Sequence, residues 1–240
     1  PQSTILKKLL KFDGSTTTEV TTLENNIENL TVSGSHFYFT STSTAEGEEL
    51  WVSDGTDLNT KPLDLFPGGT FSSSPDQLVD VNGVLYFRAV DPNEGTKGLW
   101  KSEGTLGTTE VVFSDIIGDI DNITVIGDNI FFTVDDLTIG EEIKVYNTVT
   151  EMVSEIDIMD GDSYPSNLTA YNGKLYFTYE LTSNYKSLTW LDPADMIPQP
   201  ALTSFNVTRQ NVTISEPVIT PEFFSFSVND YVTDYLQRIT

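Results

Sequence analysis

The sequence contains no cysteine and a single histidine, His36. Without cysteine the chain can form no disulfide, no thiolate metal site and no cysteine nucleophile. One histidine leaves only one candidate base for a catalytic triad, and no G-x-S-x-G motif accompanies it. Because His36 begins an aromatic segment, we interpret it as an ordinary residue at a strand edge. These absences favour a protein that is not an enzyme.

Basic residues are also scarce. The chain has 12 lysines and arginines against 36 aspartates and glutamates, which gives a formal net charge of -24. Such a charge repels nucleic acids and anionic membranes, so we expect neither as a partner. Salt or bound cations would relieve the self-repulsion, so an extracellular or calcium-rich environment suits the chain.

Long apolar runs are missing too. No segment approaches the length of a membrane span, and residues 1–10, PQSTILKKLL, lack the apolar core of a signal peptide. We therefore expect no insertion into a membrane. Apolar residues nevertheless make up 38% of the chain, which is enough for a globular core.

A helical periodicity is not found either, and an aromatic strand-like segment recurs in its place. Five phenylalanines mark equivalent positions that are 45 to 49 residues apart: Phe39, Phe87, Phe132, Phe177 and Phe226. Turns between apolar residues precede these segments, and Asn82-Gly83 and Asn172-Gly173 are strong hairpin signals because a type I′ turn needs positive φ at both central positions. Four short strands in about 45 residues are typical of a β-propeller blade.

We therefore predict an all-β fold, namely one β-propeller domain of five four-stranded blades over residues 1–240. The predicted blades span approximately 29–77, 78–121, 122–167, 168–210, and 211–240 combined with 1–28. Pairing of the N-terminal and C-terminal strands would close the ring and remove exposed sheet edges. Both Leu9–Phe12 and Leu236–Thr240 could supply the third strand of the fifth blade, so a fragment of a larger propeller is the alternative.

A longer motif recurs at the end of the predicted third strand. Residues 48–60 read EELWVSDGTDLNT and residues 97–109 read KGLWKSEGTLGTT. Asp54 can bond forward to the backbone two residues on, and Gly55 or Gly104 accepts positive φ without steric cost. Both copies thus predict a strand, a tight turn and a second strand.

This motif resembles the ELWxxDGT, or hyalin-like, repeats of bacterial secreted and cell-surface proteins. The residues that carry the resemblance are Glu49, Leu50, Trp51, Asp54, Gly55 and Thr56 in the first copy and Leu99, Trp100, Gly104, Thr105, Gly107 and Thr108 in the second. The later repeats, EEIKVYNT from Glu141 and KSLTWLDP from Lys186, lose the Asp-Gly-Thr turn. The resemblance implies propeller-like surface modules and brings no catalytic residues with it.

Two residues of the motif, Trp51 and Trp100, could line a ligand site, because aromatic faces stack on sugars and cations. A third-strand aromatic side chain can instead fill the gap between neighbouring blades. We favour this packing interpretation for both residues.

Acidic clusters are candidates for calcium, which binds six to eight oxygen ligands. The best cluster is formed by Asp157, Asp160 and Asp162 in EIDIMDGDS. The other clusters are Asp115, Asp119 and Asp121, and Glu46, Glu48 and Glu49. None follows the EF-hand spacing, and in so acidic a chain the alternative is a solvated loop. Calcium is the one cofactor that the sequence suggests.

Five N-x-[ST] sequons occur, at Asn29, Asn122, Asn167, Asn206 and Asn211. All but Asn206 stand at the entry to the predicted first strand. We attribute this recurrence to strand chemistry, with Asn ending a loop and Thr in a sheet, and not to glycan attachment.

The function that we predict is that of a non-enzymatic extracellular or cell-surface module with a structural or adhesive role. It would bind copies of itself, other surface or matrix proteins, or glycans through its loop faces. One alternative is a lectin-type propeller with a sugar pocket in each blade. A second is a glycoside hydrolase with carboxylates in the central funnel, for which Asp80, Asp121 and Glu216 are the candidates near first strands.

Overall fold

The computed structural model describes most of the chain up to residue 195 and four short strands beyond it. The described residues are 6–44, 47–67, 71–115, 118–136, 140–156, 158, 163–182, 185–195, 213–214, 218–219, 224–225 and 228–229. In this part of the chain the regular structure consists of antiparallel strands and three short 3-10 turns. The predicted all-β fold is thus confirmed.

The chain folds into successive small sheets, each built from consecutive strands. The N-terminal hairpin consists of β1 (Lys7–Phe12) and β2 (Thr17–Leu23). The first sheet contains β3 (Glu28–Ser33), β4 (His36–Ser43), β5 (Gly47–Ser53) and β6 (Lys61–Leu63). The second contains β7 (Asp76–Val81), β8 (Val84–Val90), β9 (Lys97–Ser102) and β10 (Glu110–Phe113). The third contains β11 (Ile120–Ile126), β12 (Asn129–Asp136), β13 (Gly140–Asn147) and β14 (Met152–Ile156).

The fourth sheet has three strands, β15 (Ser166–Tyr171), β16 (Lys174–Thr182) and β17 (Tyr185–Leu191). The 3-10 turns follow the third strands: η1 (Asp57–Asn59), η2 (Leu106–Thr108) and η3 (Pro193–Asp195). Two further pairs join β18 (Thr213–Ile214) to β21 (Val228–Asn229) and β19 (Val218–Ile219) to β20 (Phe224–Ser225). Within the described ranges, the four-stranded repeat that the sequence predicts is present three times in full.

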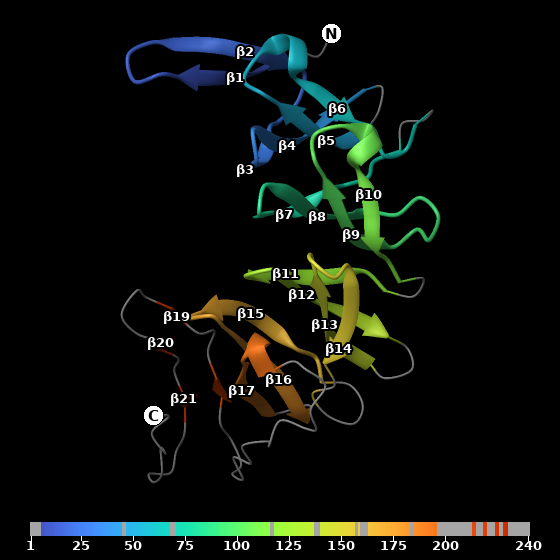
Figure 1. Cartoon of the computed structure of the whole chain (residues 1–240), viewed down its shortest axis with the longest axis vertical. Coiled ribbons are helices and arrows are strands. Elements are labelled where there is room, and N and C mark those ends of the chain that lie inside the picture. Colours follow the sequence, from blue (N-terminus) through green and yellow to red (C-terminus); the bar gives the residue numbers. More distant parts are fainter. Residues whose placement is uncertain are drawn as a thin grey trace.

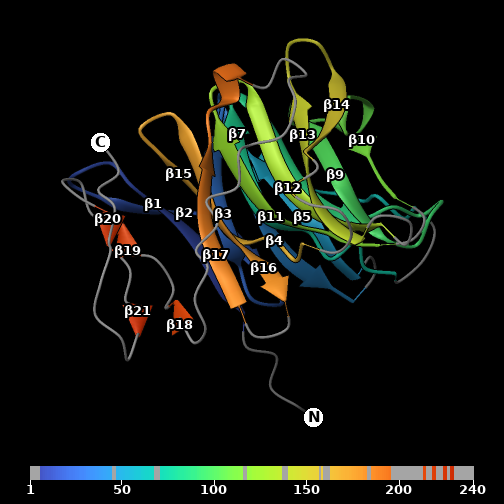
Figure 2. The same cartoon turned by 90° about the horizontal axis from the view of Figure 1, so that it is seen from below.

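The sheets stack face to face along the long axis of the molecule (Figure 1). Their first strands are neighbours, because β3 contacts β7, β7 contacts β11, and β11 contacts β15. Seen along the stack, the sheets overlie one another with their strands running in similar directions (Figure 2). The arrangement is β-propeller-like, with the first strand of each sheet innermost and the fourth outermost.

Apolar cores fill the spaces between the sheets. In a strand, successive side chains point to opposite faces, so two adjacent aromatic residues serve two different cores. In β12, Phe131 packs toward the fourth sheet and Phe132 toward the second, and both are fully buried. In β4, Tyr38 faces the second sheet while Phe39 packs against Leu9 and Val20 of the N-terminal hairpin. The recurrent aromatic segments are therefore strands that are buried on both faces.

A bulge recurs in the first strand of each of the four sheets from β3 to β17. The residues at this position have positive φ, and the register shifts there: Asn29, Gln77, Asn122 and Asn167. Asn is one of the few residues other than Gly that tolerate this conformation. Each of the three Asn side chains donates from Nδ2 to a Thr Oγ1 of the second strand, at 3.0 to 3.2 Å. The recurrence of these three sequons thus has a structural cause, and Asn206 and Asn211 lie outside the described residues.

The N-terminal hairpin packs on the first sheet through Leu9, Val20 and Leu23, which cluster with Phe39. Leu9–Phe12, one predicted third strand, lies in β1 and pairs with β2 through a turn at Asp13. Leu236–Thr240, the other candidate, lies outside the described residues. The described residues form no closed ring, because the hairpin lies at one end of the stack and β15–β17 with β18–β21 lie toward the other (Figure 1).

Replacing a bulge asparagine tests this account of the first strand. Asn167→Ala places a side chain with no local hydrogen bond in the left-handed region and removes the bond to Thr178, so we expect a loss of about 1–2 kcal/mol in unfolding free energy. Asn167→Gly keeps the backbone conformation accessible and should lose less. Urea denaturation measures both values, with the exposed Asn26→Ala as a near-neutral control. Equal stability of the two Asn167 variants would contradict a conformational cause.

Candidate functional site

The Asp-Gly-Thr turn of the first sheet is held by its own side chains. Asp54 Oδ1 accepts hydrogen bonds from the backbone N of Thr56 at 2.9 Å and from Thr56 Oγ1 at 2.7 Å, and Oδ2 accepts one from Asn59 at 2.6 Å. These bonds, first those from the side chains of Thr56 and Asn59, keep the pKa of Asp54 below its ordinary value. Gly55 has a φ of +89°. The predicted turn is confirmed, and its carboxylate is engaged in maintaining it.

The second copy of the turn contains an equivalent pair of hydroxyl groups. The hydroxyls of Ser102 and Thr109 lie 2.8 Å apart, as those of Ser53 and Thr60 do at 2.7 Å in the first copy. Gly104 leaves room for the ring of His36 from the first sheet, because a Cβ at this position would lie 3.1 Å from that ring. His36 therefore packs between two sheets at the end of its strand.

Both tryptophans of the motif are packing residues. Trp100 is buried in the core between the first and second sheets and donates from Nε1 to the carbonyl of Ala89 at 3.1 Å. Trp51 is half-buried, stacks on Phe39 with ring centroids 5.9 Å apart, and packs against the cluster under the N-terminal hairpin. The packing interpretation is confirmed for both.

Glu49 joins the first sheet to the connection that leads into the second. Its carboxylate is fully buried and accepts hydrogen bonds from Ser73 Oγ at 2.6 Å, from Ser73 N at 3.0 Å and from Leu65 N at 3.3 Å. Burial raises the pKa of Glu49 to about 6, although these hydrogen bonds act in the opposite direction. The sequence places Glu49 in a calcium cluster, but the structure shows it tying two segments together.

The equivalent position varies in the other sheets. In the third sheet Glu142 is buried and accepts a bond from Ile158 N at 3.3 Å. In the second sheet Gly98 takes this place, and a Cβ there would lie 2.4 Å from the carbonyl oxygen of Phe113. The buried Asp91 is bonded to Ser114 Oγ at 2.8 Å instead. A buried carboxylate thus anchors the exit of each of these sheets.

The described acidic residues do not converge on a metal site. Among the described residues no group of three or more His, Asp or Glu side chains could hold a metal ion. Asp119 accepts a bond from Lys97 N at 2.7 Å, and Asp121 lies 3.3 Å from Arg88 Nη1. The predicted calcium residues Asp157, Asp160 and Asp162 lie outside the described residues, as does Glu46.

The most concentrated charges lie where the second and third sheets meet. Arg88 binds Asp76 through two bonds of 2.6 and 2.7 Å and donates to the carbonyl of Ile120 at 3.0 Å. Lys97 Nζ lies 3.0 Å from the same Asp76. Burial alone would raise the pKa of Asp76, but the bonds from Arg88 and Lys97 hold it below its ordinary value. The two positive charges of the network, on Arg88 and Lys97, balance the negative charges of Asp76 and Asp121. Its contacts join the second sheet to the third.

Two of the three funnel carboxylates considered for a glycoside hydrolase, Asp80 and Asp121, lie among the described residues. Asp121 belongs to the Arg88 network, and Asp80 is exposed on β7 opposite Leu85. Glu216 lies outside the described residues.

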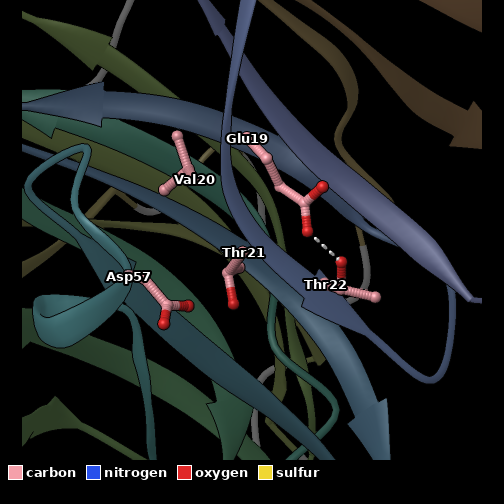
Figure 3. A pocket seen from close by; sticks show the side chains of 5 residues that line it. All are labelled: Glu19, Val20, Thr21, Thr22 and Asp57. Carbon is pink, nitrogen blue, oxygen red and sulfur yellow. Dashed lines mark hydrogen bonds between the residues drawn. The ribbon is translucent and has the colours of Figure 1, made fainter.

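A shallow hollow of about 450 Å³ lies between the N-terminal hairpin and the first sheet (Figure 3). Its lining consists of Glu19, Val20, Thr21 and Thr22 from β2 and Asp57 from η1. Thr22 Oγ1 donates to Glu19 at 2.5 Å, and Lys8 binds the same carboxylate. The bonds from Lys8 and Thr22 lower the pKa of Glu19. Hydroxyls and carboxylates of this kind can bond to a polar ligand, and no aromatic side chain lines the hollow.

Comparison with known proteins identifies no family. No family model matches the chain, and no curated protein matches its sequence. Several solved structures do match. A putative TolB from Agrobacterium tumefaciens is 12% identical, with a TM-score of 0.49, over 91% of this chain and 76% of that chain.

Two hydrolase structures have TM-scores above 0.5. A puromycin hydrolase mutant complexed with PGG is 13% identical with a TM-score of 0.52, over 76% of this chain and 29% of that chain. A puromycin-hydrolyzing peptidase from Mycobacterium tuberculosis is 12% identical with a TM-score of 0.51, over 75% of this chain and 29% of that chain. The chain thus spans less than a third of either hydrolase. At such low identity the likeness shows the propeller-like fold alone.

Glu49→Gln should flatten the pH dependence of stability. The pKa of Glu49 is about 6 in the folded chain and 4.5 ordinarily. Between pH 4.5 and 6 the folded chain therefore binds more protons than the unfolded chain does. The stability that the protonated Glu49 carboxyl contributes at low pH is lost as the pH rises through 6. The loss corresponds to about 2 kcal/mol. Gln has no proton to lose, so urea denaturation at a series of pH values should show a shallower decline.

Glu48→Gln is the matched control, because this neighbouring side chain lies outside the buried contact. It should keep the slope of the unaltered chain. If the Glu49→Gln variant showed the same dependence of unfolding free energy on pH as the unaltered chain, Glu49 would have the same pKa in the folded and unfolded states.

Proposed function

We propose that the chain is a non-enzymatic extracellular or cell-surface repeat module with a structural or adhesive role. The observation that carries this proposal is how the repeated motif is used. Asp54 holds a turn, Glu49 holds a connection, and Trp100 fills a core. The residues that recur are thus engaged in the scaffold, which leaves partner binding to loops that differ between sheets.

The loop surface supports such a role. Large apolar side chains are exposed at loop positions on several sheets, among them Leu58, Phe71, Leu106 and Val149. They stand among acidic residues, in keeping with the net charge of -24. These exposed side chains are accessible to other proteins, matrix or glycans at the loops.

The location is proposed on the resemblance to ELWxxDGT repeats and on the acidic, cysteine-free composition. Among the described residues the structure has no helix that is long and apolar enough to cross a membrane. The five-bladed ring and the single domain over residues 1–240 stay predictions, since the fifth blade would draw on residues 211–240.

A lectin-type module is the alternative function. The hollow beside β2 favours it, because Glu19, Thr21 and Asp57 present carboxylate and hydroxyl groups that can bond to a hydroxylated ligand. The packed positions of Trp51 and Trp100 speak against one aromatic sugar pocket in each sheet.

The adhesive role is tested on the cells that make the protein. We expect externally added protease to degrade it on intact cells, and the labelled purified chain to bind matrix proteins or other cells. Specific binding on a glycan array that Thr21→Val or Asp57→Asn weakens would favour the lectin alternative. A protein confined to the cytosol would overturn the proposal.

Calcium binding is proposed at Asp157, Asp160 and Asp162, and thermal unfolding tests it. A cation that binds only the folded chain stabilises it by about 2.7 kcal/mol at a hundredfold excess over Kd. We therefore expect calcium to raise Tm and a chelator to reverse the rise. Replacing the three aspartates with Asn should abolish the shift, whereas Glu24→Gln, Glu28→Gln and Glu94→Gln together remove the same charge and should keep it. A calcium-independent Tm would refute the site.

A further inference from the structure

The basic residues of this acidic chain are concentrated in one strand. Of the 12 lysines and arginines, Lys7, Lys8 and Lys11 lie in β1. Lys8 pairs with Glu19 at 2.5 Å, whereas Lys7 and Lys11 form no ion pair with any described residue. Both are exposed. A positive strand thus lies at one end of a strongly negative molecule.

The same strand exposes apolar side chains. Leu9 points into the core, but Leu10 is 54% exposed and Phe12 is 68% exposed. Covering apolar side chains of this size in a contact is favourable because it removes them from water. The strand β1 therefore exposes both basic and apolar side chains, with Leu10 and Phe12 on one face and Lys7 and Lys11 on the other.

One edge of β1 also lacks a neighbour within the described residues. Among the described residues the third strands β5, β9 and β13 each pair on both sides, whereas β1 pairs with β2 alone and β17 with β16 alone. An open edge carries unpaired backbone N–H and C=O groups and can accept a further strand. The charge of β1 selects against pairing with its own copy, because lysines would meet lysines. The occupant should be acidic.

The C-terminal strands of the same copy do not lie at this edge. β18 contacts β17, and β18–β21 lie near the opposite end of the stack from β1 (Figure 1). A second copy of the chain is the acidic partner that is always present, since the rest of each copy carries the negative charge.

Among the outer strands, β14 is the one that best complements β1. It pairs only with β13 in the described part of the chain, and with 5 residues it is longer than β6 with 3 or β10 with 4. Met152 is 65% exposed, and Glu151 and Glu155 flank it in sequence. Glu151 pairs with Lys101 and Glu155 pairs with Lys144, and both glutamate side chains reach the surface. Their carboxylates therefore stay available to a second cation.

We propose that β1 of one copy adds to the free edge of β14 of a second copy, in place of the ring closure within one copy that the sequence predicts. Lys7 and Lys11 then meet the carboxylates of Glu151 and Glu155, and Leu10 or Phe12 covers Met152. The two surfaces differ, so the contact is heterologous, and each copy keeps one free β1 and one free β14. Such a contact repeats head to tail and builds open chains of copies. The inference deepens the proposed adhesive role by naming a self-association surface, and its test in purified protein is independent of cellular location.

Sedimentation velocity of the purified chain at increasing concentration tests the contact. We expect concentration-dependent oligomers that weaken as salt is added, because the pairing charges are exposed. Lys7→Glu with Lys11→Glu should weaken association at least about tenfold, since attraction becomes repulsion. Lys61→Glu with Lys186→Glu changes the net charge equally and should leave association unchanged. If the first variant fails to fold, Lys7→Ser with Lys11→Ser serves in its place.

A mixing experiment tests the direction of the contact. The variant altered at Lys7 and Lys11 keeps β14, and Met152→Asp keeps β1, so each should be monomeric alone and the mixture should form a one-to-one dimer. A chain that stays monomeric at every concentration would overturn the proposal and favour a β1 edge covered within its own copy. Equal weakening by the control pair, or a mixture that stays monomeric, would overturn it as well.

Discussion

Burial of both faces of each sheet is the constraint on which this structure depends. Phe131 and Phe132 are neighbours in β12, yet each is fully buried in a different core. A sheet with two apolar faces cannot be stable alone in water, so every sheet requires one on either side. The stack is the direct result, and the N-terminal hairpin covers the outer face of the first sheet at Phe39.

Polar contacts determine how neighbouring sheets are aligned. Arg88 connects Asp76 of the second sheet to the carbonyl of Ile120 in the third, and Gln77 accepts a bond from Ile123 N at 2.8 Å. Thr124 Oγ1 reaches the carbonyl of Leu168 in the fourth sheet at 3.2 Å. Because these contacts lie at or beside the first strands, they fix the inner edge of the stack.

The sequence predicts the features that depend on local chemistry. Aromatic residues at a constant spacing reveal the repeat, and Asp54-Gly55 specifies its own turn. The role of Glu49 could not be predicted, because its partner Ser73 lies 24 residues further along the chain. An acidic residue in an acidic segment gives no sign that it is buried. The Arg88 network was missed for a similar reason: at this position the other sheets have Thr40, Thr133 and Thr178, so the repeat pattern itself offers no hint of an ion pair.

The bulge in the first strand limits covalent modification of the chain. The nitrogen to which an N-linked sugar would be attached is Nδ2, and in Asn122 this atom lies 3.2 Å from Thr133 Oγ1 in a part-buried position. A glycan on Nδ2 would replace one of the two amide hydrogens and place a bulky group against the second strand. In an organism that glycosylates secreted proteins, a sugar could reach this nitrogen only before the sheet forms. Once the sheet has folded, the second strand hinders access of the transferase to the part-buried Nδ2 of Asn122.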